Sequence, residues 1–281
     1  MIKNKSISPI VKWVGGKRQL LPEIVKRIPN TFSYYAEPFV GGGAVFFELQ
    51  PKKAIINDLN IELINLYKVI KYNVEELISD LSNHKNEKEY FYEIRKMDRD
   101  EGLYKKLSNV EKASRLLYLN KTCYNGLYRV NSKGQFNTPF GSYKNPNFNN
   151  KELLRELNKY FNDSQIEFYS EDYSMILNRL DSNSFVYLDP PYDPVSETSN
   201  FTSYSKTGFG QEEQIRLKEH CDQLNDQGIK FLLSNSSTPF IMDLYGNYHI
   251  DIVYARRSVN SNAQKRGEVG EVLVTNYDYT I

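Results

Sequence analysis

The sequence predicts an α/β fold built around a mostly parallel sheet. Short apolar strands alternate with helix-like segments at both ends of the 281-residue chain. A glycine-rich turn joins one of these strands to a helix, and a long middle region follows helical spacing. Strands that alternate with helices are typical of parallel sheets covered by helices. The length suits one large domain or two modest ones, with a sizeable core.

The first part of the chain combines two strands with a short helix. Residues 34–39 (YYAEPF) and 53–58 (KAIIND) are predicted as buried strands, with a helix at 44–49 (AVFFEL) between them. Apolar residues then recur at helical spacing over 61–118. Residues 121–149 are rich in Asn, Gly, Tyr and Pro and lack this period, so they predict a hairpin or a long ordered loop.

Strand patterns return in the second half of the chain. An amphipathic helix is predicted at 211–226. The last two strands follow each other without a helix, which predicts a terminal antiparallel hairpin. The predicted strands are 165–169 (QIEFY), 184–188 (SFVYL), 229–235 (IKFLLSN), 249–255 (HIDIVYA) and 271–277 (EVLVTNY).

Composition excludes several classes of protein. With 36 Lys and Arg against 35 Asp and Glu, overall charge identifies no partner. Cys123 and Cys221 lie far apart, which argues against a disulfide framework or a cysteine zinc site and fits a reducing compartment. The histidines His84, His220 and His249 form no ligand-like pair, so we expect no metal. The polar N-terminus and the lack of a long apolar run predict a soluble intracellular protein.

The glycine turn at Gly41 to Gly43 is a candidate cofactor site. Such a turn lets the backbone approach a ligand closely and points amide groups at it. The spacing is not G-x-G-x-x-G, but the next strand ends in Asp58, where α/β nucleotide binders hold ribose hydroxyls. The alternative is a tight turn that binds nothing. A second turn, Gly15 to Lys17, lacks the other residues of a P-loop, which disfavours ATP.

The DPPY stretch at 189–192 is a candidate catalytic site. Two prolines end a strand because they donate no backbone hydrogen bonds. Asp189 and the carbonyl of Pro190 can each accept one N–H of an exocyclic amine, which localises the nitrogen lone pair. Tyr192 can stack on the base, and the rigid Pro190–Pro191 unit preserves the geometry. The alternative is a proline stop beside a surface tyrosine.

With its other motifs, the sequence resembles the Dam-type DNA adenine-N6 methyltransferases of the alpha group, of GATC type. The resemblance covers nearly the whole chain. It rests on KWVGGKRQLL, EPFVGGGAVFF, NDLN, YNGLYRVNSKGQFNTPFGSYK, DPPY and EVLVTNY, in that order. It implies a Rossmann-like class I methyltransferase fold in residues 1–59 and 166–281. Residues 60–165 would be an inserted target-recognition region of helices and a hairpin.

The resemblance also implies an activity. The enzyme would transfer a methyl group from S-adenosylmethionine directly to N6 of adenine in GATC duplex DNA. The adenine would be flipped into the DPPY pocket, at an unstacking cost of a few kcal/mol. By resemblance, the catalytic residues are Asp189, Pro190, Pro191 and Tyr192. The cofactor-binding positions are Trp13, Gly16, Lys17, Phe39, Gly41, Gly43, Asp58, Asp172 and Asp189.

The same resemblance assigns DNA contacts. Arg129 would read a guanine, since arginine makes bidentate contacts worth about 1–3 kcal/mol of discrimination. Leu127 and Pro139 would contact thymine methyl groups, and Tyr124 and Asn125 would fill the stack and contact the orphaned thymine. Lys12 matches a lysine near the target site.

Residues 113–150 contain no Asp or Glu, which predicts a phosphate-facing surface. The alternative is a solvated loop that lacks acids by chance. Ser142 stands where many relatives carry Arg, which would weaken binding of all sequences alike and reduce its salt dependence. The basic residues of the window are Arg115, Lys121, Arg129, Lys133 and Lys144.

Three further stretches leave their roles open. Residues 197–209 are a lid or a plain loop, 232–237 line the target pocket or only cap a strand, and 252–267 contact the DNA backbone or are a solvated loop.

Rival functions also stay open. N4-cytosine methylation would use the same clamp, whereas C5-cytosine methylation is disfavoured because neither cysteine follows a proline. Other rivals are a DNA-binding protein with a vestigial cofactor fold and a methylase of RNA amines or amides. The expected setting is the cytoplasm of a bacterial cell, or a phage, with duplex DNA as partner and no membrane. In this setting the protein could work alongside a restriction endonuclease without contacting it directly.

Overall fold

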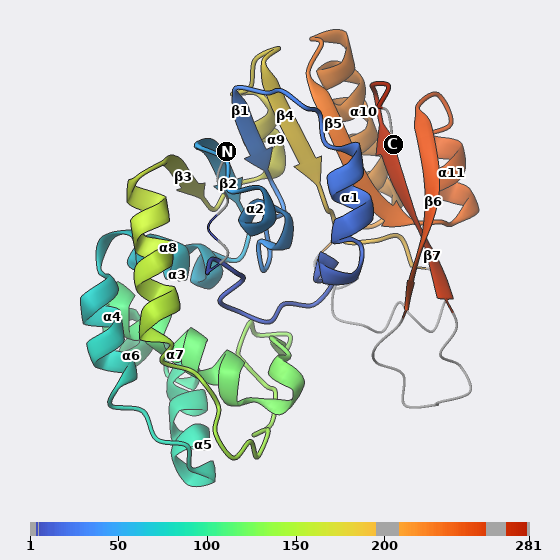
Figure 1. Cartoon of the computed structure of the whole chain (residues 1–281). Helices are drawn as coiled ribbons and strands as arrows, with labels where there is room; N and C mark the ends of the chain where they lie inside the picture. The colour runs from blue at the N-terminus through green and yellow to red at the C-terminus, as the bar shows by residue number, and fades with distance from the viewer. Residues whose placement is uncertain (1–3, 5, 195–207, 257–267, 280–281) are drawn as a thin grey trace. The chain divides into compact units, whose positions relative to one another are not determined.

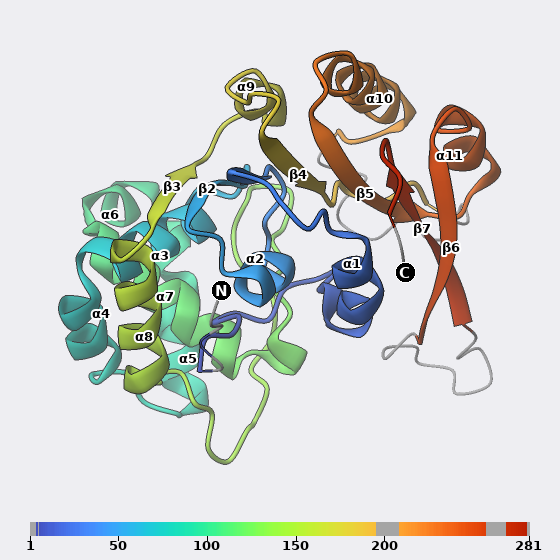
Figure 2. The ribbon, with the colours of Figure 1, turned by 45° about the horizontal axis from the view of Figure 1, so that its top comes forward.

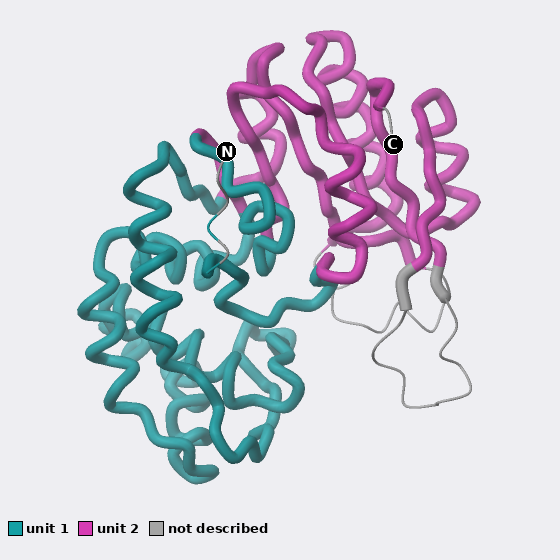
Figure 3. Tube along the Cα trace, in the orientation of Figure 1, with its two compact units in different colours: residues 1–16, 41–52, 58–170 teal, residues 17–40, 53–57, 171–281 magenta. Residues whose placement is uncertain are grey.

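The computed structural model describes residues 4, 6–194, 208–256 and 268–279. The chain divides into two compact units (Figure 3). Unit 1 contains residues 1–16, 41–52 and 58–170, and unit 2 contains residues 17–40, 53–57 and 171–281. The chain therefore passes between the units more than once.

The strands form a seven-stranded sheet in the order β3-β2-β1-β4-β5-β7-β6. β1 pairs in parallel with β2 and β4, and β4 pairs in parallel with β5. β7 is antiparallel to both β5 and β6. The predicted α/β fold, mostly parallel sheet and terminal hairpin are confirmed. The strands are β1 (Tyr34–Glu37), β2 (Lys53–Asn57), β3 (Gln165–Tyr169), β4 (Ser184–Leu188), β5 (Lys230–Ser236), β6 (His249–Arg256) and β7 (Glu268–Thr275).

In unit 2, helices cover both faces of the strands. α9 (Tyr173–Leu177), α10 (Gln211–Asp226) and α11 (Pro239–Leu244) lie on one face, and α1 (Leu21–Arg27) lies on the other (Figures 1 and 2). Side chains alternate between the faces of a strand. The core under α9 to α11 therefore takes every second residue of the central strands, namely Val186, Leu188, Phe231, Leu233, Val272 and Val274.

Unit 1 is mainly helical, and local caps explain where several helices begin. Ser108 and Glu111 form a capping box at α7, and Asn60, Asp100 and Asn150 cap α3, α6 and α8. No helix in the described ranges is long and apolar enough to cross a membrane. The helices are α2 (Ala44–Leu49), α3 (Ile61–Tyr72), α4 (Val74–Leu81), α5 (Lys88–Lys96), α6 (Glu101–Lys106), α7 (Asn109–Thr122) and α8 (Lys151–Asn162). The short 3-10 turns are η1 (Lys17–Gln19, in unit 2), η2 (Met97–Arg99) and η3 (Tyr124–Gly126).

The predicted hairpin follows α7. Antiparallel bridges join Cys123 to Phe140 and Val130 to Phe136. The Asn131 N–H donates to the Gln135 carbonyl at 2.8 Å and closes its tip. We call residues 123–140 the reading hairpin, after the role in DNA recognition that the resemblance implies for it.

Candidate functional site

The glycine turn between β1 and α2 requires glycine for both conformation and space. Gly41 and Gly43 have φ of +48° and +70°, in the left-handed region that disfavours other residues. A Cβ added at Gly41 would lie 2.8 Å from Trp13 Cδ1, and one added at Gly43 would lie 2.8 Å from Phe47 Cε2. The turn thus packs directly against the Trp13 ring.

Asp58 ties this turn to the start of α3. Its carboxylate accepts the Gly41 N–H at 2.9 Å and the Asn60 N–H at 2.8 Å. Burial raises the pKa of Asp58, and these two backbone hydrogen bonds oppose the rise. Unit 1 therefore brings together Trp13, Gly41, Gly43 and Asp58. A side-chain-free turn beside an acidic group fits the ribose end of a nucleoside cofactor.

Gly16 and Lys17 follow Trp13 in the chain but differ in their contacts. The Gly16 N–H donates to the Trp13 carbonyl at 3.3 Å, within unit 1. Lys17 is buried in unit 2, where its ammonium lies 2.9 Å from a carboxylate oxygen of Asp189. Lys17 thus contacts the predicted catalytic residue.

Asp189 comes directly after β4 and lies at the centre of a small polar network. Its side chain is 19% exposed. Ser234 Oγ donates to Asp189 Oδ1 at 2.9 Å, and Tyr187 Oη lies 3.0 Å from Ser234 Oγ. Burial raises the pKa of Asp189, whereas Lys17 and Ser234 act to lower it. The network fixes the direction of the carboxylate and favours its ionised form against the cost of burial.

Tyr192 is held from two sides. Lys17 Nζ lies 4.6 Å from the centre of its ring, a cation–π contact. The phenol donates to Glu271 Oε2, in β7, at 2.7 Å. Burial raises the pKa of Tyr192 well above its usual range, helped by the charges of Asp189 and Glu271. Glu271 was not predicted as a site residue, because nothing near it in the chain marks it as a partner of DPPY.

The polar end of β5 braces the loop that carries DPPY. Asn235 Oδ1 accepts the Asp193 N–H at 3.1 Å, and Ser236 Oγ donates to the Asp193 carbonyl at 2.6 Å. Gln214 Nε2, from α10, donates to the Pro191 carbonyl at 2.8 Å. The bonds made by Ser234, Asn235 and Ser236 therefore make residues 232–237 a support for the DPPY loop. Gln214 adds support from α10.

Phe39 and Asp172 also lie in unit 2. The Phe39 ring packs 5.2 Å from the ring of Tyr173. Asp172 caps α9 through the Ser174 N–H and pairs with Arg216 at 2.8 Å. Partial burial acts to raise the pKa of Asp172, but hydrogen bonds from Arg216 and Ser174 outweigh it and lower this pKa to about 2. Asp172 is therefore already engaged as a helix cap and ion-pair partner.

The predicted DNA-contacting residues gather in unit 1, on and beside the reading hairpin. Arg129 is exposed, and its Nε donates to Asn137 Oδ1 at 2.7 Å. Asn125 adopts a φ of +55° next to Gly126. The side chains of Lys12, Tyr124, Asn125, Pro139 and Lys144 are exposed, and that of Leu127 is half-buried.

Lys12 is fixed at the base of the reading hairpin. Its backbone N–H donates to Asn120 Oδ1 at 2.9 Å, and Asn120 Nδ2 donates back to its carbonyl at 2.8 Å. A Cβ added at Gly126 would lie only 2.4 Å from Lys12 Cδ. Residues 12 and 13 therefore contact both the reading hairpin and the glycine turn.

The position of Arg115 contradicts its predicted place on a phosphate-facing surface. It lies in the acid-free window, but its side chain is only 7% exposed and pairs with Asp98 at 2.8 Å. It also donates to the carbonyls of Ile94 and Arg95. The prediction is wrong for Arg115 because its acidic partner comes from outside the window. Arg129, Lys133 and Lys144 are exposed.

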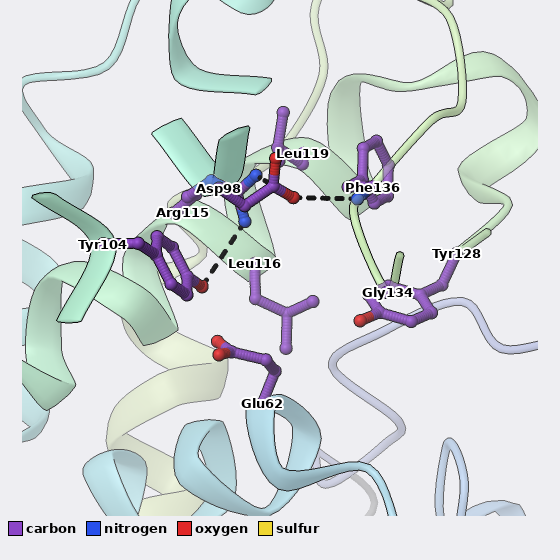
Figure 4. A pocket seen from close by; sticks show the side chains of 9 residues that line it. All are labelled: Glu62, Asp98, Tyr104, Arg115, Leu116, Leu119, Tyr128, Gly134 and Phe136. Atoms are coloured by element: carbon purple, nitrogen blue, oxygen red, sulfur yellow. Dashed lines mark hydrogen bonds and ion pairs between the residues drawn. The ribbon is translucent and has the colours of Figure 1, made fainter. Parts of the chain in front are cut away.

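The ion pair of Asp98 and Arg115 borders a cavity of about 50 Å³ beneath the reading hairpin (Figure 4). Asp98 Oδ2 accepts the Phe136 N–H at 2.8 Å, and Arg99 Nη2 donates to the Phe136 carbonyl at 2.6 Å. These contacts attach the second arm of the hairpin to the helices of unit 1. The cavity is lined by Glu62, Asp98, Tyr104, Arg115, Leu116, Leu119, Tyr128, Gly134 and Phe136.

Two predicted segments lie largely outside the described residues. These are the possible lid at 197–209 and the possible backbone contact at 252–267. Within the described ranges, no group of three or more His, Cys, Asp or Glu side chains could hold a metal ion.

A family model and several known proteins match this chain along nearly its whole length. A family model described as D12 class N6 adenine-specific DNA methyltransferase matches residues 13–259. The chain is 48% identical to the type II methyltransferase M1.LlaDCHI of Lactococcus lactis subsp. cremoris, over 98% of each chain. It is 39% identical to the type II methyltransferase M.MjaIII of Methanocaldococcus jannaschii, over 96% of this chain and 99% of that one. It is 37% identical to the DNA adenine methylase of Escherichia coli K12, over 97% and 95%.

Proposed function

Since the chain belongs to the D12 class N6 adenine-specific DNA methyltransferase family, we propose that it methylates N6 of the adenine in GATC duplex DNA after flipping that base into the DPPY pocket. The observation that carries the proposal is the position of Asp189. This carboxylate comes directly after β4 and is held by Lys17 and Ser234. We further propose that residues 1–59 and 166–281 form the catalytic domain and that residues 60–165 recognise the target.

The cofactor in this proposal is S-adenosylmethionine, which supplies an electrophilic methyl group when bound. Asp58 would accept hydrogen bonds from ribose hydroxyls, and the backbone amides of the glycine turn at Gly41 to Gly43 would face the ligand. Trp13, which packs on the turn, would form an apolar wall. Gly16, Lys17, Phe39, Asp172 and Asp189 are assigned to the cofactor site by resemblance alone.

The chemistry assigned to DPPY follows from the weak nucleophilicity of an aromatic amine. Asp189 would accept one N–H of the adenine amine, and the Pro190 carbonyl would accept the other. Both bonds pull the nitrogen toward tetrahedral geometry and expose its lone pair. Tyr192 would stack on the base. Because Lys17 and Ser234 already orient Asp189, little reorganisation is needed when the base enters.

The product identifies the reaction. We expect unmethylated plasmid incubated with the protein and S-adenosylmethionine to yield N6-methyladenine, measured by mass spectrometry of the digested nucleosides. Sequencing of the modified sites should place the methyl group in GATC. N4-methylcytosine as the product would contradict adenine as the target. No product at saturating cofactor would favour a DNA-binding protein with a vestigial cofactor site.

Arg129→Ala is expected to reduce discrimination at one guanine of the target more than overall affinity. A lost bidentate contact to guanine corresponds to about 1–3 kcal/mol of discrimination. The measurement compares Kd for GATC duplex and for duplexes changed at each G·C pair. The matched control is Lys144→Ala, another exposed residue of the acid-free window. It should weaken all duplexes alike and reduce the salt dependence. Equal loss on every duplex with Arg129→Ala would make Arg129 a phosphate contact.

The other contacts complete the proposed recognition of DNA. Leu127 and Pro139 would touch thymine methyl groups, and Tyr124 and Asn125 would occupy the space left by the flipped adenine. Lys12 would lie near the target. Two relatives are named type II methyltransferases, so we propose that an endonuclease cutting the same sequence accompanies this enzyme without direct contact. Its presence would be detected as cleavage of unmethylated GATC in extracts of the source cell.

A further inference from the structure

An aromatic stack lies between the glycine turn and the reading hairpin. The centres of the Trp13 and Tyr128 rings are 4.7 Å apart, and the planes of the two rings are inclined by only 19°. Trp13 also packs on Gly41 and Gly42, where added Cβ atoms would lie 2.8 and 3.1 Å from its side chain. One tryptophan therefore touches both the proposed cofactor turn and the tyrosine that precedes Arg129.

Tyr128 has a second connection to the cofactor side. Burial raises the pKa of Tyr128, and the Asn60 side chain beside it opposes the rise. The backbone N–H of Asn60 donates to Asp58, which in turn accepts the Gly41 N–H. Tyr128 thus stacks on Trp13, which packs on the turn, and lies near Asn60, whose N–H donates to the same Asp58 that holds the turn.

On its other side, Tyr128 belongs to the frame of the reading hairpin. Its ring lines the cavity in Figure 4 and lies 5.8 Å from the ring of Phe136. The backbone N–H of Phe136 is anchored to Asp98, and the Asn137 N–H donates to the Arg129 carbonyl at 2.9 Å. A shift of Tyr128 would therefore move the backbone of Arg129 against an anchored arm.

We propose that Tyr128 is a positioning residue that couples occupancy of the cofactor site to DNA reading. A ligand on the glycine turn confines Trp13, which holds Tyr128 and the adjoining Arg129 in one arrangement. The bound cofactor thereby tightens binding of the target sequence, and target DNA tightens cofactor binding by the same factor. This inference rests on the proposed function of the two sites.

The test uses S-adenosylhomocysteine, which occupies the cofactor site without methylating DNA. Kd for a GATC duplex is measured with and without this ligand for the wild type, Tyr128→Phe and Tyr128→Leu. We expect the ligand to tighten binding by about 5-fold or more in the wild type and in Tyr128→Phe, which keeps the ring. In Tyr128→Leu the effect should fall to about 2-fold or less. Trp13 is the single tryptophan of the chain, so its fluorescence reports ligand binding and the stack directly.

Each outcome decides the inference. Full coupling in Tyr128→Leu would overturn it, and so would the absence of coupling in the wild type, a measurement that does not depend on any variant folding. Failure of the wild type to bind S-adenosylhomocysteine or to make N6-methyladenine would instead overturn the proposed function. Normal methylation with unchanged coupling in Tyr128→Leu would overturn the inference alone.

Discussion

Asp189→Ala is expected to lower kcat for methyl transfer by about 10³-fold or more, a far larger effect than any change in the Kd of cofactor or DNA. The change removes the acceptor that holds the target amine, an interaction of the reacting centre that binding elsewhere cannot replace. The measurement is a single-turnover assay with a labelled methyl donor, together with Kd values for both ligands. Turnover close to the wild-type value would exclude Asp189 from the chemistry.

The same change leaves the buried ammonium of Lys17 without its carboxylate, so a loss of stability must be separated from a loss of chemistry. The control is the double variant Lys17→Met/Asp189→Ala, which removes both charges of the pair. The free energy of unfolding of the double variant should lie closer to the wild-type value than the free energy of unfolding of Asp189→Ala does. Turnover should stay lost. Recovery of turnover in the double variant would mean that the single variant had only disturbed the fold.

Asp98→Ala is expected to lower the free energy of unfolding by about 3–5 kcal/mol, because it leaves the buried guanidinium of Arg115 uncompensated. It also removes the acceptor of the Phe136 N–H. Urea denaturation followed by circular dichroism measures the change.

The matched control is Glu75→Ala. It breaks an ion pair of similar length with Arg155, but both of these side chains are more than half exposed. The control should leave the free energy of unfolding essentially unchanged, since water already solvates both groups. Equal losses in Asp98→Ala and Glu75→Ala would show that burial of the first pair carries no special cost.

The fold was predictable wherever its signal is local. Apolar runs with a proline close to one end mark β1, β2 and β4, and helical spacing marks α3 and α7. The insertion of β7 between β5 and β6 was not predicted, because pairing of distant strands leaves no trace in the spacing of one segment. Helix α8 is different. Leu154, Leu157 and Phe161 are buried at helical spacing, so its pattern was present but was not identified.

The site was predictable in its motifs and less so in its partners. Asp189, Tyr192 and the glycine turn belong to recognisable stretches. Ser234 lies 45 residues from Asp189 and Glu271 lies 79 from Tyr192, so only the folded chain brings them together. The exposure of Arg115 was predicted wrongly for the same reason. A count of acidic residues within a window cannot detect Asp98, which precedes the window and approaches only through the packing of unit 1.

The interleaved chain path of the two units also affects how the protein emerges from a ribosome. Strand β1 can pair with β2 soon after both are made, but its other neighbour, β4, begins only roughly 150 residues after β1 ends. At typical rates of synthesis this interval lasts about 8 to 30 s. During it one edge of β1 has no native partner, while residues 58–170 of unit 1 are completed. Translation thus delivers the helical unit whole before the central strands of the sheet can close.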